Sequence, residues 1–192
     1  MTSFAFEKMN IPGAYLVTSF FSEDNRGSFV KSFEKDIFAE NGIEFFCNED
    51  FISHSTKNVI RGMHFQTYHP QAKLVGVISG KVYDVIVDLR EDSPTFGQWQ
   101  GVYLSAQNRQ SLLIPRGCAH GFISLSDDSV VSYKCDGKYD KETDTGIMFN
   151  DPDIGVVWPI MDISDAVVGA RDQKQMSFAE FKQNCRFIYE ED

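Results

Sequence analysis

The fold is indicated most clearly by residues 73–89, which read KLVGVISGKVYDVIVDL. Two runs of mostly β-branched and aliphatic residues, 73–78 and 81–89, stand on either side of Ser79 and Gly80. β-Branched residues favour strands, and a glycine with positive φ joins two antiparallel strands through a tight turn. The stretch therefore predicts a β-hairpin.

Similar short runs follow along the chain, separated by turn residues. The further predicted strands are 98–104, 111–114, 121–125 and 130–135, with turns at 92–94, 115–117 and 127–128. Many short strands at even spacing are typical of a sandwich or a barrel. The pattern favours an all-β fold, a double-stranded jelly-roll β-barrel, formed by a single domain over residues 1–192.

Helical signals are confined to two short segments. Residues 33–41 have amphipathic spacing and end before Gly42, and residues 177–184 begin with Ser177, followed three residues later by Glu180. A serine and a glutamate at this spacing form a capping box at a helix N-terminus. We expect both helices to be short and peripheral.

The composition is that of a folded protein with an acidic surface. Of the 192 residues, 42% are hydrophobic and 24% are charged, and the net charge is −10. The electrostatic field of this negative charge repels nucleic acid and anionic membrane surfaces. No stretch of the sequence approaches the ~18 apolar residues of a transmembrane helix. We therefore expect no nucleic-acid or membrane partner and a cytoplasmic location. An anionic substrate would require local Arg and Lys residues inside a cleft.

Two of the four histidines stand beside glycine at predicted strand starts. His64 follows Gly62 by two residues, and His120 directly precedes Gly121. In a small barrel such positions often point into the opening, where ligands bind. Spacing alone fits a structural histidine at each position equally well.

A metal site is the main competing interpretation of these histidines. Metal-binding barrels generally present two histidines at alternate positions of one strand and a carboxylate a few residues on. Here His64 is followed by Phe65 and Gln66, so the second imidazole is missing, and the four cysteines lack zinc-ligand spacing. The sequence favours a metal-free site that works by proton transfer.

Proton transfer at carbon needs a base and an acid. A histidine with a pKa near ~6.5 is a usable general base, and His64 would provide it. Tyr133 lies on a predicted inner strand and would act as the acid from the other face of a substrate. A buried core tyrosine is the alternative interpretation of that residue.

The ordered motifs resemble those of the dTDP-4-dehydrorhamnose 3,5-epimerase family. They are VIRGMHFQ at 59–66, QAKLV at 71–75, GKVYDVIVDLR at 80–90, SPTFG at 93–97 and IPRGCAHGF at 114–122. Shorter matches from IPG at 11–13 to RD at 171–172 extend the resemblance over nearly the whole chain. It implies a jelly-roll homodimer of the cupin type, without metal or organic cofactor. Its substrate would be a nucleotide-linked 4-keto-6-deoxy sugar, inverted at C3, at C5 or at both.

The resemblance also implies roles for individual residues. Four match catalytic positions: the base His64, the carboxylate Asp172 that orients it, the acid Tyr133, and Lys73 beside the keto oxygen. Three match substrate contacts: Arg26 of the nucleotide-diphosphate site, Arg61 and His120. A C–H next to a carbonyl becomes removable when its enolate oxygen is stabilised, and the lysine would supply that stabilisation.

Four positions of the implied substrate site depart from the family pattern. Lys31 stands where glutamate is usual, Glu49 and Phe51 replace Gln-x-Asn, and Asp144 replaces a longer glutamate. These positions resemble contacts to the base and the sugar. The nucleotide is therefore open between dTDP, CDP and GDP.

Three other functions are compatible with the same fold. A 3,4-ketoisomerase would use a similar histidine base but deliver protons on one face of the sugar. A non-catalytic sugar-nucleotide-binding cupin would keep the pocket alone, and a cupin oxygenase would need iron or manganese. Tyr133 paired with His64 favours epimerisation, and the presence of Lys73 and Asp172 as well favours catalysis.

Overall fold

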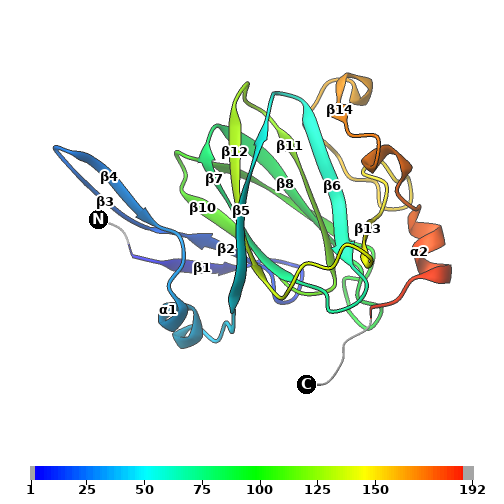
Figure 1. The fold of residues 1–192 in the computed structure, drawn as a ribbon, viewed down its shortest axis with the longest axis horizontal. Coiled ribbons are helices and arrows are strands. Elements are labelled where there is room, and N and C mark those ends of the chain that lie inside the picture. Colours follow the sequence, from blue (N-terminus) through cyan, green and yellow to red (C-terminus); the bar gives the residue numbers. More distant parts are fainter. Residues whose placement is uncertain (1–2, 188–192) are drawn as a thin grey trace.

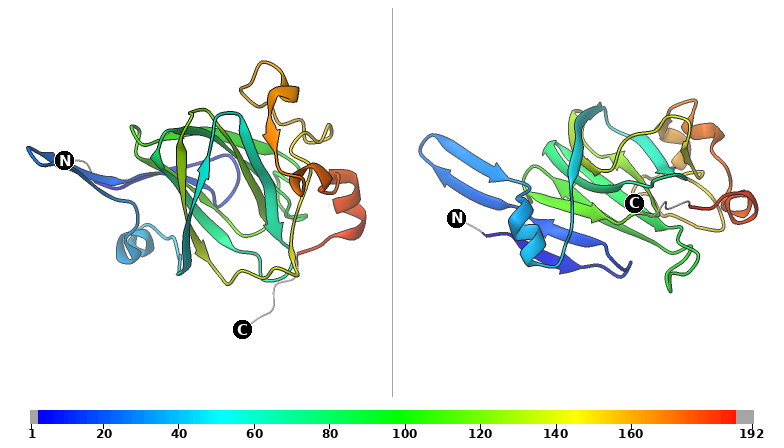
Figure 2. Two further views of the ribbon diagram at one scale, coloured as in Figure 1. Left: turned by 45° about the horizontal axis from the view of Figure 1, so that its top comes forward. Right: turned by 60° about the horizontal axis from the view of Figure 1, so that its bottom comes forward.

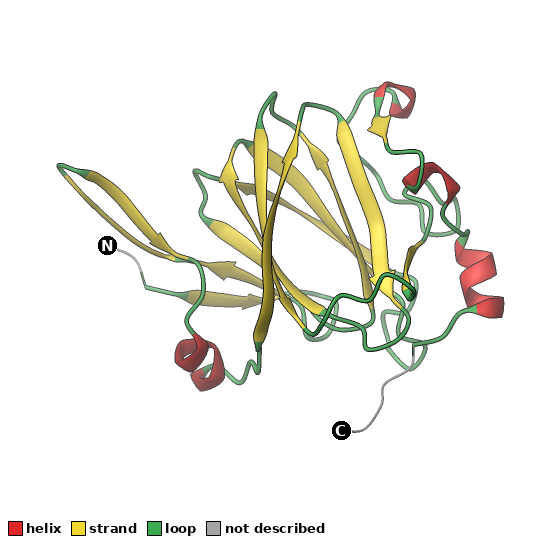
Figure 3. Ribbon diagram, in the orientation of Figure 1, coloured by secondary structure: helices red, strands yellow, loops and turns green. Residues whose placement is uncertain are grey.

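The computed structural model describes residues 3–187, and strands dominate it (Figure 1, Figure 3). Two largely antiparallel sheets face each other, and the short helices lie at the periphery (Figure 3). This confirms the prediction of an all-β jelly-roll fold with a few peripheral helices.

The two sheets differ in strand order, and successive strands mostly alternate between them. The first sheet has the order β1-β2-β10-β7-β12-β5. Its strands are β1 (Ala5–Lys8), β2 (Tyr15–Thr18), β10 (Gln110–Ile114), β7 (Ala72–Ser79), β12 (Ser129–Asp136) and β5 (Cys47–Ser55). The second has the order β13-β6-β11-β8-β9, with β14 parallel to β6. Its strands are β13 (Asp144–Gly146), β6 (Val59–Gln66), β11 (Cys118–Ser124), β8 (Lys81–Asp88), β9 (Trp99–Ser105) and β14 (Val167–Val168).

Apolar side chains fill the space between the sheets. Val75 and Leu112 of the first sheet pack in one cluster with Ile86 and Phe122 of the second, and all four are buried. Burial of this apolar surface stabilises the sandwich and fixes the spacing of the two sheets.

The C-terminal segment covers the outer face of the second sheet. Helix α2 (Phe178–Asn184) packs Phe178 and Phe181 in one cluster with Phe65 and Val87. The second half of strand β8 is consequently buried on both faces, which explains the consecutive apolar residues 85–87. Two 3₁₀ turns, η1 (Ile163–Asp165) and η2 (Asp172–Lys174), lie in the same segment.

A two-stranded hairpin stands outside both sheets. It consists of β3 (Phe20–Asp24) and β4 (Gly27–Lys31) and projects away from the barrel (Figure 1, Figure 2). Helix α1 (Lys35–Glu40) follows and packs Phe38 in a cluster with Leu74 of the first sheet. Within residues 3–187, no helix has the length and apolar character needed to cross a membrane.

The predicted elements are confirmed with small shifts in their ends. The six predicted strands correspond to β7 to β12, and Gly80 turns the β7–β8 hairpin with φ +77°. Helix α1 ends before Gly42, and Ser177 and Glu180 form the predicted capping box of α2.

The prediction that both histidines lie at strand starts was wrong for His64, whereas His120 is the third residue of its strand. Strand β6 begins at Val59, and His64 lies near its far end, whereas β11 begins at Cys118. The glycines that suggested strand starts are instead inside the strands, at a point where β6 and β11 approach each other closely.

Candidate active site

A cavity of about 760 Å³ opens between the two sheets. It is lined by the four residues expected to be catalytic, His64, Lys73, Tyr133 and Asp172. It is also lined by five of the seven expected substrate contacts, Glu49, Phe51, Arg61, His120 and Asp144. The fold thus brings residues from distant parts of the sequence into one space.

Strand alternation explains why these side chains share the cavity. Successive side chains of a strand point to opposite faces, so Phe51 of β5 faces the interior whereas Asp50 faces outward. Cross-strand register then places Tyr133 of β12 opposite Phe51, and His120 of β11 opposite His64 of β6. His64 and Tyr133 consequently belong to different sheets on either side of the cavity.

His64 and Asp172 form a short hydrogen bond. His64 Nε2 lies 2.6 Å from Asp172 Oδ1, and Oδ2 accepts from the backbone N–H of Gly62 at 3.1 Å. Burial alone would raise the pKa of Asp172, but His64, the Gly62 N–H and Arg171 together hold it below its ordinary value. An ionised carboxylate therefore faces one edge of the imidazole, an arrangement that orients a histidine base and stabilises its protonated form.

Gly62 makes this geometry possible because β6 and β11 touch at that point. Its φ is +132°, and a Cβ there would lie 2.5 Å from Gly121 Cα. A Cβ on Gly121 would in turn lie 2.7 Å from the Arg61 carbonyl oxygen. Only a pair of glycines allows the strands to come this close, which explains the glycine beside each histidine.

Lys73 reaches the cavity from β7 in the first sheet. Burial lowers the pKa of its ammonium group below the ordinary value, although Cys135, Asp144 and Asp84 partly oppose this shift. In such partly desolvated surroundings a positive charge interacts strongly with negative charge that develops on a substrate oxygen. The lysine is therefore suited to stabilise an enolate.

Tyr133 lies between two other rings of the cavity wall. The Phe51 ring stacks on it with centroids 4.7 Å apart, and the His120 ring meets it edge-on at 5.9 Å. Burial raises the pKa of the phenol above its ordinary value, with the Ser53 hydroxyl partly opposing the rise. The phenol therefore stays protonated at neutral pH, as a proton donor must.

His120 has a carboxylate partner that sequence reasoning missed. Its Nε2 lies 3.0 and 2.9 Å from the two carboxylate oxygens of Asp84, which is fully buried. Burial raises the pKa of Asp84, and the charge and hydrogen bond of His120 oppose that rise. The available signal was an aspartate in the middle of the mostly apolar residues 82–87 of β8.

The rim of the cavity contains a polar cluster that the sequence predicted only in part. Arg171 Nη1 lies 2.8 Å from Asp144 Oδ2, and the Tyr139 hydroxyl donates to the same oxygen at 3.0 Å. Glu49 accepts a hydrogen bond from the Tyr139 backbone N–H at 2.7 Å. The position of Arg171 directly before Asp172 was the one sequence signal for this cluster.

Arg61 is held at the rim by its neighbours on β5. Its Nε donates to Ser55 Oγ at 3.0 Å, and its Nη2 donates to the His54 carbonyl at 2.9 Å. The guanidinium is thereby fixed beside the cavity and supplies positive charge for an anionic ligand.

Arg26 and Lys31 do not line this cavity. Both belong to the projecting β3–β4 hairpin, where Arg26 pairs with Asp24 at 2.6 Å and Lys31 pairs with Glu34 at 2.6 Å. The Arg26 side chain is 85% exposed. Within one chain, Arg26 and Lys31 are therefore separate from the four expected catalytic residues and from the other five expected substrate contacts.

The assembled groups can move protons at a carbon beside a carbonyl. A histidine with an ionised partner and a protonated tyrosine face the cavity from opposite sheets, and a lysine reaches it from β7, the strand beside that of the tyrosine. Residues 3–187 contain no cluster of three or more His, Cys, Asp and Glu side chains arranged to hold a metal ion.

Replacing Asp172 by asparagine should make the free energy of unfolding depend less on pH in the acidic range. A carboxylate with a lowered pKa contributes stability that is complete above its ordinary pKa and is lost as pH falls through its folded-state pKa. We expect D172N to be less stable than wild type by about 1.5–3 kcal/mol at neutral pH. Urea unfolding at a series of pH values should show this difference shrinking toward pH 3, and a constant difference would contradict the assignment.

Comparisons with known proteins agree with the geometry of this site. The family model described as dTDP-4-dehydrorhamnose 3,5-epimerase matches residues 8–180. A protein of that name from Methanothermobacter thermautotrophicus is 45% identical over 173 residues, which are 90% of this chain and 94% of the relative.

Solved structures are similarly close. The epimerase of Legionella pneumophila, crystallised with dTDP-4-keto-L-rhamnose, matches with a TM-score of 0.91 and 33% identity over 98% of this chain and all of that one. A 3′-monoepimerase from Streptomyces bikiniensis, in complex with dTDP-quinovose, matches with a TM-score of 0.85 and 29% identity over 92% and 89% of the two chains. The chain belongs to the dTDP-4-dehydrorhamnose 3,5-epimerase family.

Proposed function

We propose that the protein inverts C3, C5 or both in a nucleotide-diphosphate-linked 4-keto-6-deoxy hexose, without a metal or organic cofactor. The observation that carries the proposal is the placement of His64 and Tyr133 on facing sheets, with Lys73 in the same cavity. Inversion requires that a proton leave one face of a carbon and return to the other. Groups on opposite walls meet that requirement.

The reaction begins when His64 removes a proton from a carbon next to the C4 ketone. Asp172 holds the imidazole in place and stabilises the positive charge that it acquires. The electron pair of the broken C–H bond moves onto the ketone oxygen, and Lys73 stabilises the resulting enolate. Such a base typically contributes about 10²–10⁴-fold to the rate.

The reaction ends when Tyr133 donates its proton to the opposite face of the same carbon. The enolate collapses to the ketone with inverted configuration. The phenolate then regains a proton from solvent, and the imidazolium of His64 releases one to it. Since the pKa of Tyr133 is raised by burial, its phenolate is strongly basic and recovers that proton readily. Both carbons that flank the ketone carry protons made acidic in this way.

The substrate is a nucleotide sugar, and the names of the relatives support dTDP as its nucleotide. Tyr139 is about half exposed at the rim, beside Asp144 and Arg171, where an aromatic base has room to stack. Glu49 and Phe51 differ from the family pattern in this region, so CDP and GDP sugars belong in the same test.

Proton exchange in D₂O tests the proposal. Wild-type protein should introduce deuterium at C3, C5 or both of dTDP-4-keto-6-deoxyglucose and release an inverted product, both followed by NMR. CDP and GDP analogues should be compared under the same conditions. A ketone moved from C4 to C3 would identify a ketoisomerase, and inertness toward all three substrates would contradict the proposal.

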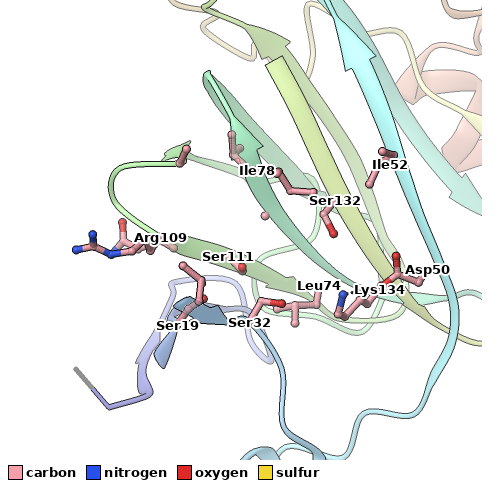
Figure 4. A pocket seen from close by; sticks show the side chains of 15 residues that line it. Ser19, Ser32, Asp50, Ile52, Leu74, Ile78, Arg109, Ser111, Ser132 and Lys134 are labelled. Carbon is pink, nitrogen blue, oxygen red and sulfur yellow. Dashed lines mark hydrogen bonds and ion pairs between the residues drawn. The ribbon is translucent and has the colours of Figure 1, made fainter. Parts of the chain in front are cut away.

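We further propose that the functional unit is a homodimer in which the hairpin of one chain completes the site of the other. A groove of about 450 Å³ lies on the outer face of the first sheet (Figure 4). Ile52 and Ile78 at this groove are more than half exposed, as is Phe29 of the hairpin. Pairing two copies through these surfaces would bury them and carry Arg26 toward a partner's cavity.

Replacing Arg26 by alanine should mainly weaken substrate binding. We expect KM to rise about tenfold, the effect of losing one charge-assisted contact to a phosphate, with kcat changed much less. Glu23→Gln on the same hairpin is the matched control and should leave both constants unchanged. Sedimentation should give twice the 21.8 kDa mass of one chain, and a fully active monomer would refute the shared site.

A further inference from the structure

Phe51 stands directly against the proposed acid of the reaction. It pairs with Tyr133 across β5 and β12, and both side chains face the cavity. The two rings are 4.7 Å apart at their centroids and only 13° from parallel. This is a stacked aromatic pair, in which each ring restricts the orientation of the other.

The environments of the two rings are unequal. Tyr133 is 7% exposed and has the His120 ring against it edge-on, whereas Phe51 is 46% exposed. Phe51 is therefore the outer member of the pair and shields one face of the phenol from the water in the cavity.

The orientation of the Tyr133 hydroxyl determines whether an enolate is converted to inverted product or back to substrate. His64 can return the abstracted proton to the face that it left, which regenerates the substrate. Tyr133 can instead deliver a proton to the opposite face, which gives inversion. The two outcomes compete from one intermediate, so the fraction inverted depends on how well the Tyr133 hydroxyl points at the carbon.

We infer that Phe51 is a positioning residue that holds Tyr133 in its donating orientation and thereby sets the ratio of inversion to proton return. This inference rests on the proposed function and adds to it, because it concerns the partition of the enolate and not its formation. Enolate formation depends on His64 and Lys73, neither of which is stacked on Phe51 in the structure.

Deuterium labelling separates the two outcomes. In D₂O, the imidazolium of His64 exchanges the abstracted proton for solvent deuterium, and return after that exchange appears as deuterium in recovered substrate of unchanged configuration. Inversion appears as deuterated product. We expect the ratio of inversion to return to fall about tenfold in Phe51→Ala, whatever its total exchange, and tenfold is the free-energy equivalent of one aromatic stack. Phe51→Tyr should restore the wild-type ratio, and Phe51→Leu, which keeps apolar volume without a ring, should be intermediate.

Controls distinguish this role from a general loss of structure. His54→Ala, an exposed position on the same strand, should leave the ratio unchanged. Should Phe51→Ala fail to fold, the comparison of Phe51→Leu with Phe51→Tyr carries the test. Equal ratios in wild type and the leucine or alanine variant would overturn the inference, even if both rates fell together. A wild-type protein without any exchange would instead contradict the proposed function.

Discussion

Replacing His64 by asparagine is expected to lower turnover by about 10²–10⁴-fold, the usual contribution of a general base. The amide cannot accept the carbon-bound proton, and it is shorter than the imidazole, so the hydrogen bond from His64 Nε2 to Asp172 is lost as well. Because the first step is blocked, exchange of substrate protons with solvent should fall as far as product formation does. This differs from the Phe51 variants, in which inversion and proton return are expected to change unequally.

The measurement is deuterium incorporation into substrate and product, together with kcat and KM. His54→Asn is the matched control, because it makes the same substitution at a histidine whose side chain is 67% exposed on the outer face of β5. Binding of the product should be retained in H64N, since the other cavity residues are unchanged. Exchange at the wild-type rate in H64N would show that another group acts as the base.

The strands that could be predicted are those with an apolar interior face. From β7 to β12, most interior positions are aliphatic or aromatic, and turns with glycine, proline or aspartate separate the runs. The intrinsic strand preference of these residues and their burial then indicate the same structure, and the alternating hydrophobic pattern can be recognised in the sequence. The capping box of α2 is legible for a similar reason, because both partners lie within four residues.

Strand β5 escaped prediction because its interior face lines a cavity. Glu49 and Ser53 occupy positions that would be apolar in a strand packed on a dry core, and Phe51 between them is half exposed. A polar interior position removes the contrast between the two faces on which a period of two depends. The polar side chains that line the cavity therefore remove the alternating hydrophobic pattern by which this strand could be predicted.

The site was predictable to different degrees for physical reasons. His64 and Lys73 occur in distinctive local motifs, whereas Asp172 meets His64 from a segment 108 residues away. Asp84 gave little signal, because its role comes from burial against His120 of a neighbouring strand. Pairings of this kind depend on sheet order, which the sequence of a single chain does not display.

Lys73 is the residue for which activity and stability should change in opposite directions. Its ammonium group is held in surroundings that lower its pKa through burial, so the folded chain binds its proton less tightly than the unfolded chain does. Stability rises with pH wherever the unfolded state binds more protons. The folded protein should therefore gain stability as pH rises from the lowered pKa of the folded state to the ordinary lysine pKa of the unfolded chain.

Replacing Lys73 by methionine should abolish most of the activity and remove this pH dependence. Loss of one donor to a developing oxyanion typically costs about 10²–10³-fold in kcat, and methionine fills similar volume without charge. Below the lowered pKa of the folded state, where wild type bears the full cost of burying the ammonium, K73M should be the more stable protein. Lys81→Met, at an exposed position on β8, is the control for removing a charge. Urea unfolding from pH 7 to 10 measures the stability of K73M, and D₂O exchange measures its activity. An active K73M, or one whose stability depends on pH as that of wild type does, would place the ammonium outside the reacting centre.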